Sequence, residues 1–178
     1  ASRVSAPVFH MGGVTPECRS LADVGGAALA ARRVTAADIA DLQAPFGAAG
    51  EAVDVVVFAA PQLSLVEMGQ VAALCDGRHR AESTDLVVCT SAQVYGDAAS
   101  MGFVGTIESF GGTVLTGTCF YQQYAREIGE ANGWNRLLSN SAKIVNILGG
   151  YGYRPALASM VDCVASAEAG KIVAPGGA

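Results

Sequence analysis

The stretch Val53-Asp-Val-Val-Val-Phe58, continued by Ala59-Ala-Pro-Gln-Leu-Ser64-Leu-Val-Glu67, decides the fold class of this protein. Its apolar, β-branched first half is typical of a strand that is buried on both faces of a parallel sheet. Ser64 and Glu67 form a capping box, in which each side chain satisfies an unpaired backbone N–H at the start of a helix. A strand that runs directly into a capped helix indicates an α/β protein.

The same alternation of strand and helix continues along the chain. Further strands are expected over Ala6–His10, Leu86–Cys89 and Thr113–Thr116, and helices over Ser20–Ala31, Ala36–Leu42, Leu65–Leu74, Ala92–Ser100, Val104–Phe110 and Ala158–Ala169. Helix starts with a Ser or Thr at the N-cap position support these helices. They are Thr15-Pro16, Thr35-Ala-Ala-Asp38, Thr90-Ser-Ala-Gln93 and Ser159-Met-Val-Asp162. The pattern predicts one α/β lobe over residues 1–178, with three α/β/α layers around a mostly parallel sheet.

Composition excludes several classes of protein. The chain has 178 residues, of which 51% are hydrophobic, enough for a folded core. Its apolar runs are all shorter than the roughly 18 residues that a membrane helix needs, so no membrane contact is expected. With 16 acidic and 11 basic residues and no basic stripe, no nucleic acid is expected as a partner. Five cysteines without a CxxC motif predict neither a zinc ribbon nor a disulfide framework, and fit a cytoplasmic protein with reduced thiols.

Polar residues follow the expected strands at the edge where open α/β sheets bind ligands. They include an imidazole, an ammonium, thiols, hydroxyls and an amide, a set that suits a small polar or anionic ligand. The candidate loops are poor in carboxylates, so a glycosidase with paired acids is not expected. The sequence also has no GxGxxG or P-loop motif and no GxSxG elbow, so neither nucleotide binding nor serine hydrolase activity is expected. The candidates are His10, Thr15, Ser64, Cys89, Thr90, Ser91, Thr118, Cys119, Asn140, Ser141 and Lys143.

Several of these residues have a structural alternative. Ser64 and Thr90 are either helix caps or ligand contacts, and His10 is either a structural histidine or a functional one. Cys75 and Cys163 are expected in the core, whereas Cys119 lies in a Gly/Thr loop where a thiolate can bind metal. Lys143 stands near a helix start against the preference of the helix dipole, which indicates a role in binding an anion.

Five stretches together resemble the aconitase X family, which includes cis-3-hydroxy-L-proline dehydratases and mevalonate 5-phosphate dehydratases. They are Pro7-Val-Phe-His-Met-Gly-Gly-Val-Thr-Pro-Glu17, Val53–Glu67, Thr116-Gly-Thr-Cys119, Ser139-Asn-Ser-Ala-Lys143 and Asp162-Cys-Val-Ala-Ser-Ala167. Their order follows the C-terminal part of the large catalytic subunit. The string His-x-x-Gly-Val-Thr-Pro-Glu is specific, and Ser-Asn-Ser-Ala-Lys is moderately so.

The resemblance implies an aconitase-superfamily-like fold and a hydro-lyase that removes water from a small hydroxy acid. An iron–sulfur cluster or a mononuclear iron then acts as Lewis acid on the departing hydroxyl. Cys119 is the implied metal ligand, and Cys89 is a second candidate ligand. His10 and Lys143 are the implied catalytic residues, facing a carboxylate or phosphate. The implied substrate-binding residues are Thr15, Ser64, Thr90, Ser91, Thr118, Asn140 and Ser141.

Two departures limit the resemblance. Where the family reads Pro-His after a strand, often with a preceding cysteine, this chain reads Ala60-Pro61-Gln62. The family also has an upstream segment of the large subunit and a small swivelling domain with a serine base, which are the implied partners. We expect cis-3-hydroxy-L-proline as substrate, because the His10–Pro16 string resembles that branch most. The alternatives are mevalonate 5-phosphate and a metal-free binding or scaffold module, which Ala60 and Gln62 favour.

Overall fold

The computed structural model describes residues 9–26, 28–43 and 49–176. Contacts divide the chain into two units, Ala1–Leu42 and Gln43–Ala178. Each unit is treated by itself, and the expectation of one lobe over 1–178 stays a prediction. Within the described parts of the chain, no helix combines the length and the apolar character needed to cross a bilayer.

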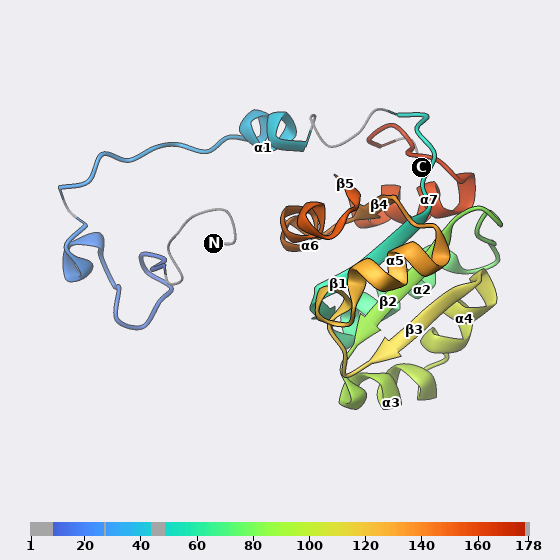
Figure 1. The fold of residues 1–178 in the computed structure, drawn as a ribbon. Coiled ribbons are helices and arrows are strands. Elements are labelled where there is room, and N and C mark those ends of the chain that lie inside the picture. Colours follow the sequence, from blue (N-terminus) through green and yellow to red (C-terminus); the bar gives the residue numbers. More distant parts are fainter. Residues whose placement is uncertain (1–8, 27, 44–48, 177–178) are drawn as a thin grey trace. The chain divides into compact units, whose positions relative to one another are not determined.

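The second unit is built on a five-stranded sheet with the order β3-β2-β1-β4-β5, in which every pair is parallel (Figure 1). The strands are β1 (Val55–Leu63), β2 (Asp85–Thr90), β3 (Gly112–Thr116), β4 (Arg136–Ser139) and β5 (Arg154–Leu157). The α-helices of this unit are α2 (Leu65–Cys75), α3 (Ala92–Ser100), α4 (Phe103–Phe110), α5 (Ala125–Asn132), α6 (Ala142–Leu148) and α7 (Met160–Ala169), joined by the 3-10 helices η3 (Phe120–Gln122) and η4 (Gly149–Tyr151).

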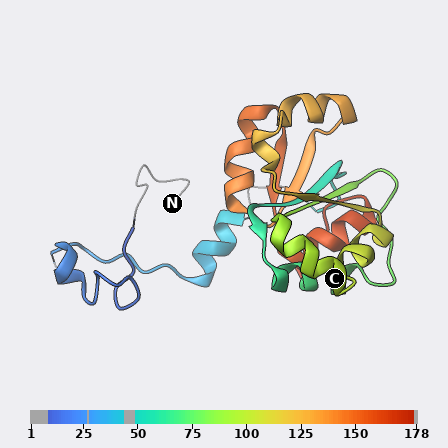
Figure 2. The ribbon, with the colours of Figure 1, turned by 90° about the horizontal axis from the view of Figure 1, so that it is seen from below.

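Two hydrophobic clusters place helices on both faces of the sheet. On what we call the first face, side chains from α2, α3, α4 and α7 pack with Phe58, Leu86 and Val88. On the second face, side chains from α5 and α6 pack with Val55, Val57 and other strand residues. Figure 2 shows the orange helices α5 and α6 on one side of the strands and the green helices α2 and α3 on the other. The expected three-layer α/β/α architecture is confirmed.

Local sequence signals account for most of the element boundaries. The Ser64 side chain accepts a hydrogen bond from the Glu67 N–H, and the reciprocal bond of the capping box is also present. Helix α4 ends at Gly111, whose φ of 101° is favoured only in glycine. At Gly112, which begins β3, an added Cβ would lie 2.9 Å from Ile107 Cγ2 and 3.0 Å from the Ile107 carbonyl, so a side chain does not fit there.

The bounds expected for the helix Ala92–Ser100 are confirmed, but its N-cap was predicted one residue early, at Thr90. The N-cap of α3 is Ser91, whose side chain accepts from the Val94 N–H at 3.1 Å. Thr90 belongs to β2, and its buried Oγ1 donates to the Leu63 carbonyl at 2.7 Å. Strand pairing therefore outweighs the capping pattern at this residue.

Other boundaries also differ from the expectation. Strands β4 and β5 and helix α5 were not predicted, because β4 has only four residues, β5 contains Pro155 and α5 is rich in polar residues. Pro155 is compatible with a strand here because β5 lies at an edge of the sheet.

The first unit contains η1 (Leu21–Val24) and α1 (Ala36–Gln43). The capping interaction at α1 is confirmed, with the Asp38 N–H donating to Thr35 Oγ1 at 3.2 Å. The helix expected over Ser20–Ala31 is wrong for the described residues, which form only the short η1 and turns. Of the strand expected at Ala6–His10, the first three residues lie outside the described ones, and the last two are not in a strand.

Candidate functional site

The candidate site lies at the carboxyl ends of β1 and β4, where the order of strands reverses direction. From β1 the chain adds β2 and β3 on one side, and then returns to add β4 and β5 on the other. In open α/β sheets, such a switch point leaves a crevice at the carboxyl edge, where ligands bind. The site therefore follows from topology before any side chain is considered.

Two serines join the β4 end to the β1 end. Ser139 Oγ donates to the Val57 carbonyl at 2.6 Å, and Ser141 Oγ donates to the Ala60 carbonyl at 2.7 Å. Ser141 also caps α6 by accepting from the Ile144 N–H at 3.3 Å. The Ser141 hydroxyl is thus already engaged as donor and acceptor, and it holds the loop between β4 and α6 against the end of β1.

The β3 end joins the same group of loops. Gln62 Nε2 donates to the Thr118 carbonyl at 2.8 Å, and the Gly117 N–H donates to the Thr90 carbonyl at 3.0 Å. The loops after β1, β2, β3 and β4 are thus connected directly by hydrogen bonds. The expected convergence of these four loops at one edge is present in the structure.

Two thiols lie near each other at this edge. Cys89 is fully buried in the second-face cluster, whereas Cys119 is half-buried. Burial, and to a lesser extent the nearby Cys119, raises the pKa of the Cys89 thiol to about 11. Cys89 is therefore a neutral thiol at pH 7. Cys75 and Cys163 are buried on the first face, which confirms the expectation that they belong to the core.

Thr118 has a buried hydroxyl without a hydrogen-bond partner, a feature that the sequence could not reveal. Its side chain is only 9% exposed, and its Oγ1 has no hydrogen-bond partner. A buried hydroxyl without a partner costs free energy, so such groups call for a specific explanation. A ligand that hydrogen-bonds to this hydroxyl would remove that cost.

The remaining predicted residues of this unit are more exposed. Asn140 and Lys143 are exposed, and Lys143 Nζ lies 5.4 Å from the centroid of the Tyr121 ring, within cation–π range. The Ser64 hydroxyl takes part in the capping box of α2 and donates to Glu67 Oε2 at 2.7 Å. Its structural alternative as a cap is thereby confirmed.

His10 and Thr15 belong to the first unit. His10 is exposed, with Nδ1 3.7 Å from Glu17 Oε1. Thr15 Oγ1 accepts from the Met11 N–H at 2.8 Å, and the expected helix after Thr15 is replaced by turns. Their roles at the site stay predictions.

The ligand set for a metal is incomplete. Among the described residues, no group of three or more His, Cys, Asp or Glu side chains is placed to hold a metal ion. Iron–sulfur clusters take four protein ligands in their common forms, more than Cys89 and Cys119 supply. Gln62 stands where the family resemblance implied a histidine, and its side chain donates a hydrogen bond to the loop that carries Cys119.

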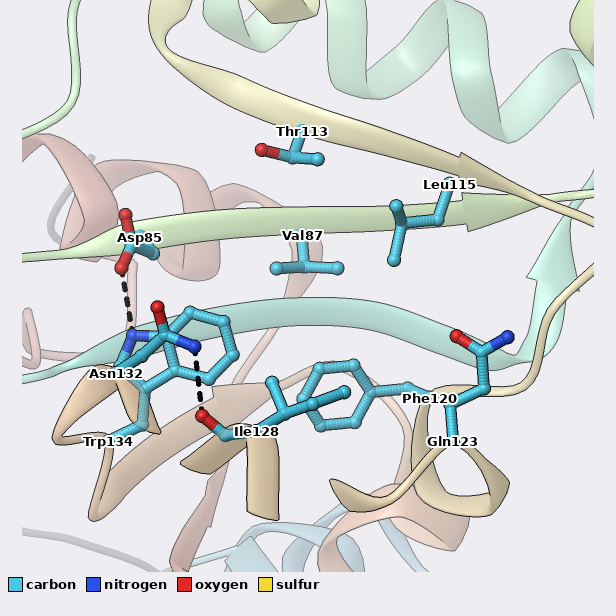
Figure 3. A pocket seen from close by; sticks show the side chains of 9 residues that line it. All are labelled: Asp85, Val87, Thr113, Leu115, Phe120, Gln123, Ile128, Asn132 and Trp134. Atoms are coloured by element: carbon cyan, nitrogen blue, oxygen red, sulfur yellow. Dashed lines mark hydrogen bonds between the residues drawn. The ribbon is translucent and has the colours of Figure 1, made fainter. Parts of the chain in front are cut away.

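A separate pocket of about 250 Å³ lies on the second face and extends from Asp85, at the start of β2, to Phe120, the residue after Cys119 (Figure 3). Val87 and Leu115 form its sheet side, and Phe120 and Ile128 lie opposite them. At one end, Trp134 Nε1 donates to Asp85 Oδ2 at 2.8 Å. It contains none of the predicted site residues.

The fold and the edge together define an open, doubly wound α/β domain whose candidate site lies at its switch point. Residues 53–169 match the family model of the aconitase X third domain. The chain therefore belongs to the aconitase X family.

Individual relatives agree with this assignment. The chain is 34% identical over 171 residues to a cis-3-hydroxy-L-proline dehydratase of Pseudomonas aeruginosa, an alignment that covers 94% of this chain and 29% of that protein. It is 30% identical over 151 residues to a phosphomevalonate dehydratase large subunit of Methanothermobacter thermautotrophicus, with 84% and 36% covered. The crystal structure of Thermococcus kodakaraensis aconitase X in its holo-form shares the fold, with a TM-score of 0.64 at 19% identity over 87% of this chain and 38% of that one. The chain thus spans about a third of the length of these relatives.

Proposed function

We propose that this chain is part of a hydro-lyase that removes water from a small hydroxy acid, and that the acid is cis-3-hydroxy-L-proline. Family membership supports the reaction class, and the P. aeruginosa relative, at 34% identity, supports the substrate. The structural observation that carries the proposal is the buried Thr118 hydroxyl without a partner, next to Cys119 in the loop after β3 that Gln62 connects to the β1 end. A bound hydroxy acid would supply that partner.

The exposed Lys143 suits the carboxylate of such a substrate. Its ammonium lies beside the Tyr121 ring at the same edge, where an anion can approach from solvent. Asn140, which is exposed two residues before α6, carries a side-chain amide that can donate a hydrogen bond to the same substrate. We assign substrate binding to Thr118 and Asn140, and propose Lys143 and His10 as the catalytic residues, with Lys143 facing the substrate carboxylate.

Iron is proposed as the cofactor, with Cys119 and Cys89 as the ligands that the described residues offer. When bound, the metal supplies Lewis-acid assistance to the departure of hydroxide. The remaining ligands have to come from other parts of the complete protein, since the described residues lack a group of three.

Partners are proposed on the same basis. The M. thermautotrophicus relative is named a large subunit, and this chain covers 36% of it. We propose that the working enzyme contains the remaining part of the large subunit and a small swivelling domain or subunit, in the cytoplasm.

The test is an assay of the complete protein with its partner, prepared anaerobically with iron. We expect loss of water from cis-3-hydroxy-L-proline, and a fall of about 10- to 100-fold in kcat/KM for Cys119→Ser, as for other changes around metal sites. Thr118→Val is expected to raise KM. Cys75→Ser, on the first face, is the matched control and should retain activity.

The outcomes separate the candidates. If the protein turned over mevalonate 5-phosphate in preference to cis-3-hydroxy-L-proline, mevalonate 5-phosphate would become the proposed substrate. Ligand binding without turnover or iron would support the metal-free binding module that Gln62 favours. Full activity of Cys119→Ser would overturn the assignment of this thiol.

A further inference from the structure

Gln62 lies where β1 departs from regular pairing. The two strands β1 and β2 stay in register up to Phe58 and Val88, and pairing resumes only at Leu63 and Thr90. Four residues of β1 therefore stand opposite the single residue Cys89, and they form a loop at the carboxyl edge. Gln62 is the last residue of this loop.

The loop is held in a defined conformation. Ala60 has a φ of 51°, a left-handed value that costs a residue with a Cβ roughly 1–2 kcal/mol. Hydrogen bonds hold the segment at both ends, from Ser141 Oγ to the Ala60 carbonyl and from Thr90 Oγ1 to the Leu63 carbonyl. The Gln62 side chain thus extends from a fixed backbone.

The bond from Gln62 acts on the peptide unit that precedes Cys119. Its Nε2 donates to the Thr118 carbonyl at 2.8 Å, across 56 positions of sequence. Because a peptide unit is planar, fixing the direction of this carbonyl also fixes the N–H of Cys119. Fixing this plane also fixes the N–Cα bond of Cys119, and the Cys119 φ of −117° then sets the direction of Cβ, so the direction in which the thiol leaves the loop is restrained as well.

The other hydrogen bonds of the Gly117–Cys119 loop do not fix the Thr118–Cys119 peptide, so its orientation depends on Gln62. Gly117 is held through its own N–H by the Thr90 carbonyl, and the Cys119 carbonyl accepts from the Gln122 N–H at 3.0 Å. These bonds hold the two ends of the short loop, whereas the Gln62 bond holds its middle. The Thr118 hydroxyl, which has no partner, does not add a restraint.

We propose that Gln62 is a positioning residue: its carboxamide, through the Thr118 carbonyl, sets the orientation of the Thr118–Cys119 peptide and with it the placement of the Cys119 thiol beside Cys89. Its importance for catalysis rests on the proposed function. The effect on the thiol does not, and it can be measured in this chain alone.

The experiment measures the rate at which iodoacetamide alkylates Cys119 in the full chain, with EDTA present and peptide mass spectrometry as the readout. Gln62→Met keeps the length of the side chain and its neutral charge but lacks the donor. Gln62→His restores an N–H donor. Gln70→Met, at an exposed site on α2, is the matched control.

We expect Gln62→Met to raise the Cys119 rate about fivefold, the size of effect that one ordinary hydrogen bond gives. Gln62→His should return the rate toward that of the parent, and Gln70→Met should leave it unchanged. Alkylation of the buried Cys89 should stay slow in all of them. A serine at this position is too short to reach Thr118, so Gln62→Ser should have the same effect as Gln62→Met. It takes the place of Gln62→Met if Gln62→Met does not fold.

A rate within twofold of the parent for both donor-free variants would overturn the proposal. So would a parallel rise at Cys89 and Cys119, because that pattern indicates general loosening of the domain. Failure of the dehydratase proposal is distinguishable, since it appears as missing turnover in the complete protein while these alkylation differences persist.

Discussion

The first face of the sheet is covered by four helices, and Phe58, Met68 and Phe110 are buried there among aliphatic residues. The second face is covered by α5 and α6, and its cluster includes the aromatic residues Phe120 and Tyr153, of which Phe120 also lines a pocket of about 250 Å³. Cys89 and the segment that follows Cys119 belong to the second face. The difference indicates that the first face mainly stabilises the domain, while the second face supports the candidate site.

The largest expected effect compares one phenylalanine from each face. Phe58→Ala should lower the free energy of unfolding by about 3–5 kcal/mol, because it leaves a cavity in a fully buried cluster. Phe120→Ala should cost at most about 3 kcal/mol, since Phe120 borders a pocket that water can enter. Urea denaturation of both variants measures the difference. Equal losses would show that the two faces are packed equally well.

A second comparison concerns two serine caps. Ser91→Ala removes the cap of α3, and we expect a loss of about 1 kcal/mol. Ser141→Ala removes the cap of α6 and also the hydrogen bond to the Ala60 carbonyl, so about 2 kcal/mol is expected. Denaturation midpoints test this order. A reversed order would mean that the bond between the β4 and β1 ends contributes little to stability.

The smallest effect is a dependence of stability on alkaline pH from the first face. Burial raises the pKa of Cys75 to about 12 and raises that of Cys163 further. Below pH 8 both thiols are protonated in the folded and unfolded states. As the pH rises through 9, the unfolded thiols ionise while the folded ones stay neutral, so stability is lost, by about 0.4 kcal/mol for each thiol at pH 9.

Cys163→Ala should reduce this slope by about a third, after correction for its lower stability at pH 7, because Cys75 and the second-face Cys89 both keep their raised pKa values. Denaturation series between pH 7 and 9.5 give the slopes. An unchanged slope in the variant would show that Cys163 does not contribute to the pH dependence.

Prediction from sequence succeeded where local patterns and tertiary contacts agree. Helix α3 was predicted with both its ends, and β1 to β3 lie where apolar β-branched runs occur. It failed where the tertiary context decides. β5 is a short segment with a proline that becomes a strand through its pairing with β4. Thr90 has the sequence of a cap, but its hydroxyl bonds to a neighbouring strand.

The candidate site shows the same division. The sequence identified Thr118, Cys119, Asn140 and Lys143 as chemistry-bearing residues at the ends of strands or starts of helices. It did not reveal Gln62 as a donor or the missing partner of the Thr118 hydroxyl, because both depend on residues that lie far apart in the chain.

By itself, the sequence determined the α/β class and the position of most helices, because capping and periodic burial are properties of neighbouring residues. Its motifs also resembled the family that the comparisons then showed. Only the tertiary structure decided the strand order, and with it the switch point between β1 and β4. It also decided which side chains join the loops there. The physical reason is that strand order and hydrogen bonds between loops are set by packing and closure over long sequence separations, which no local pattern encodes.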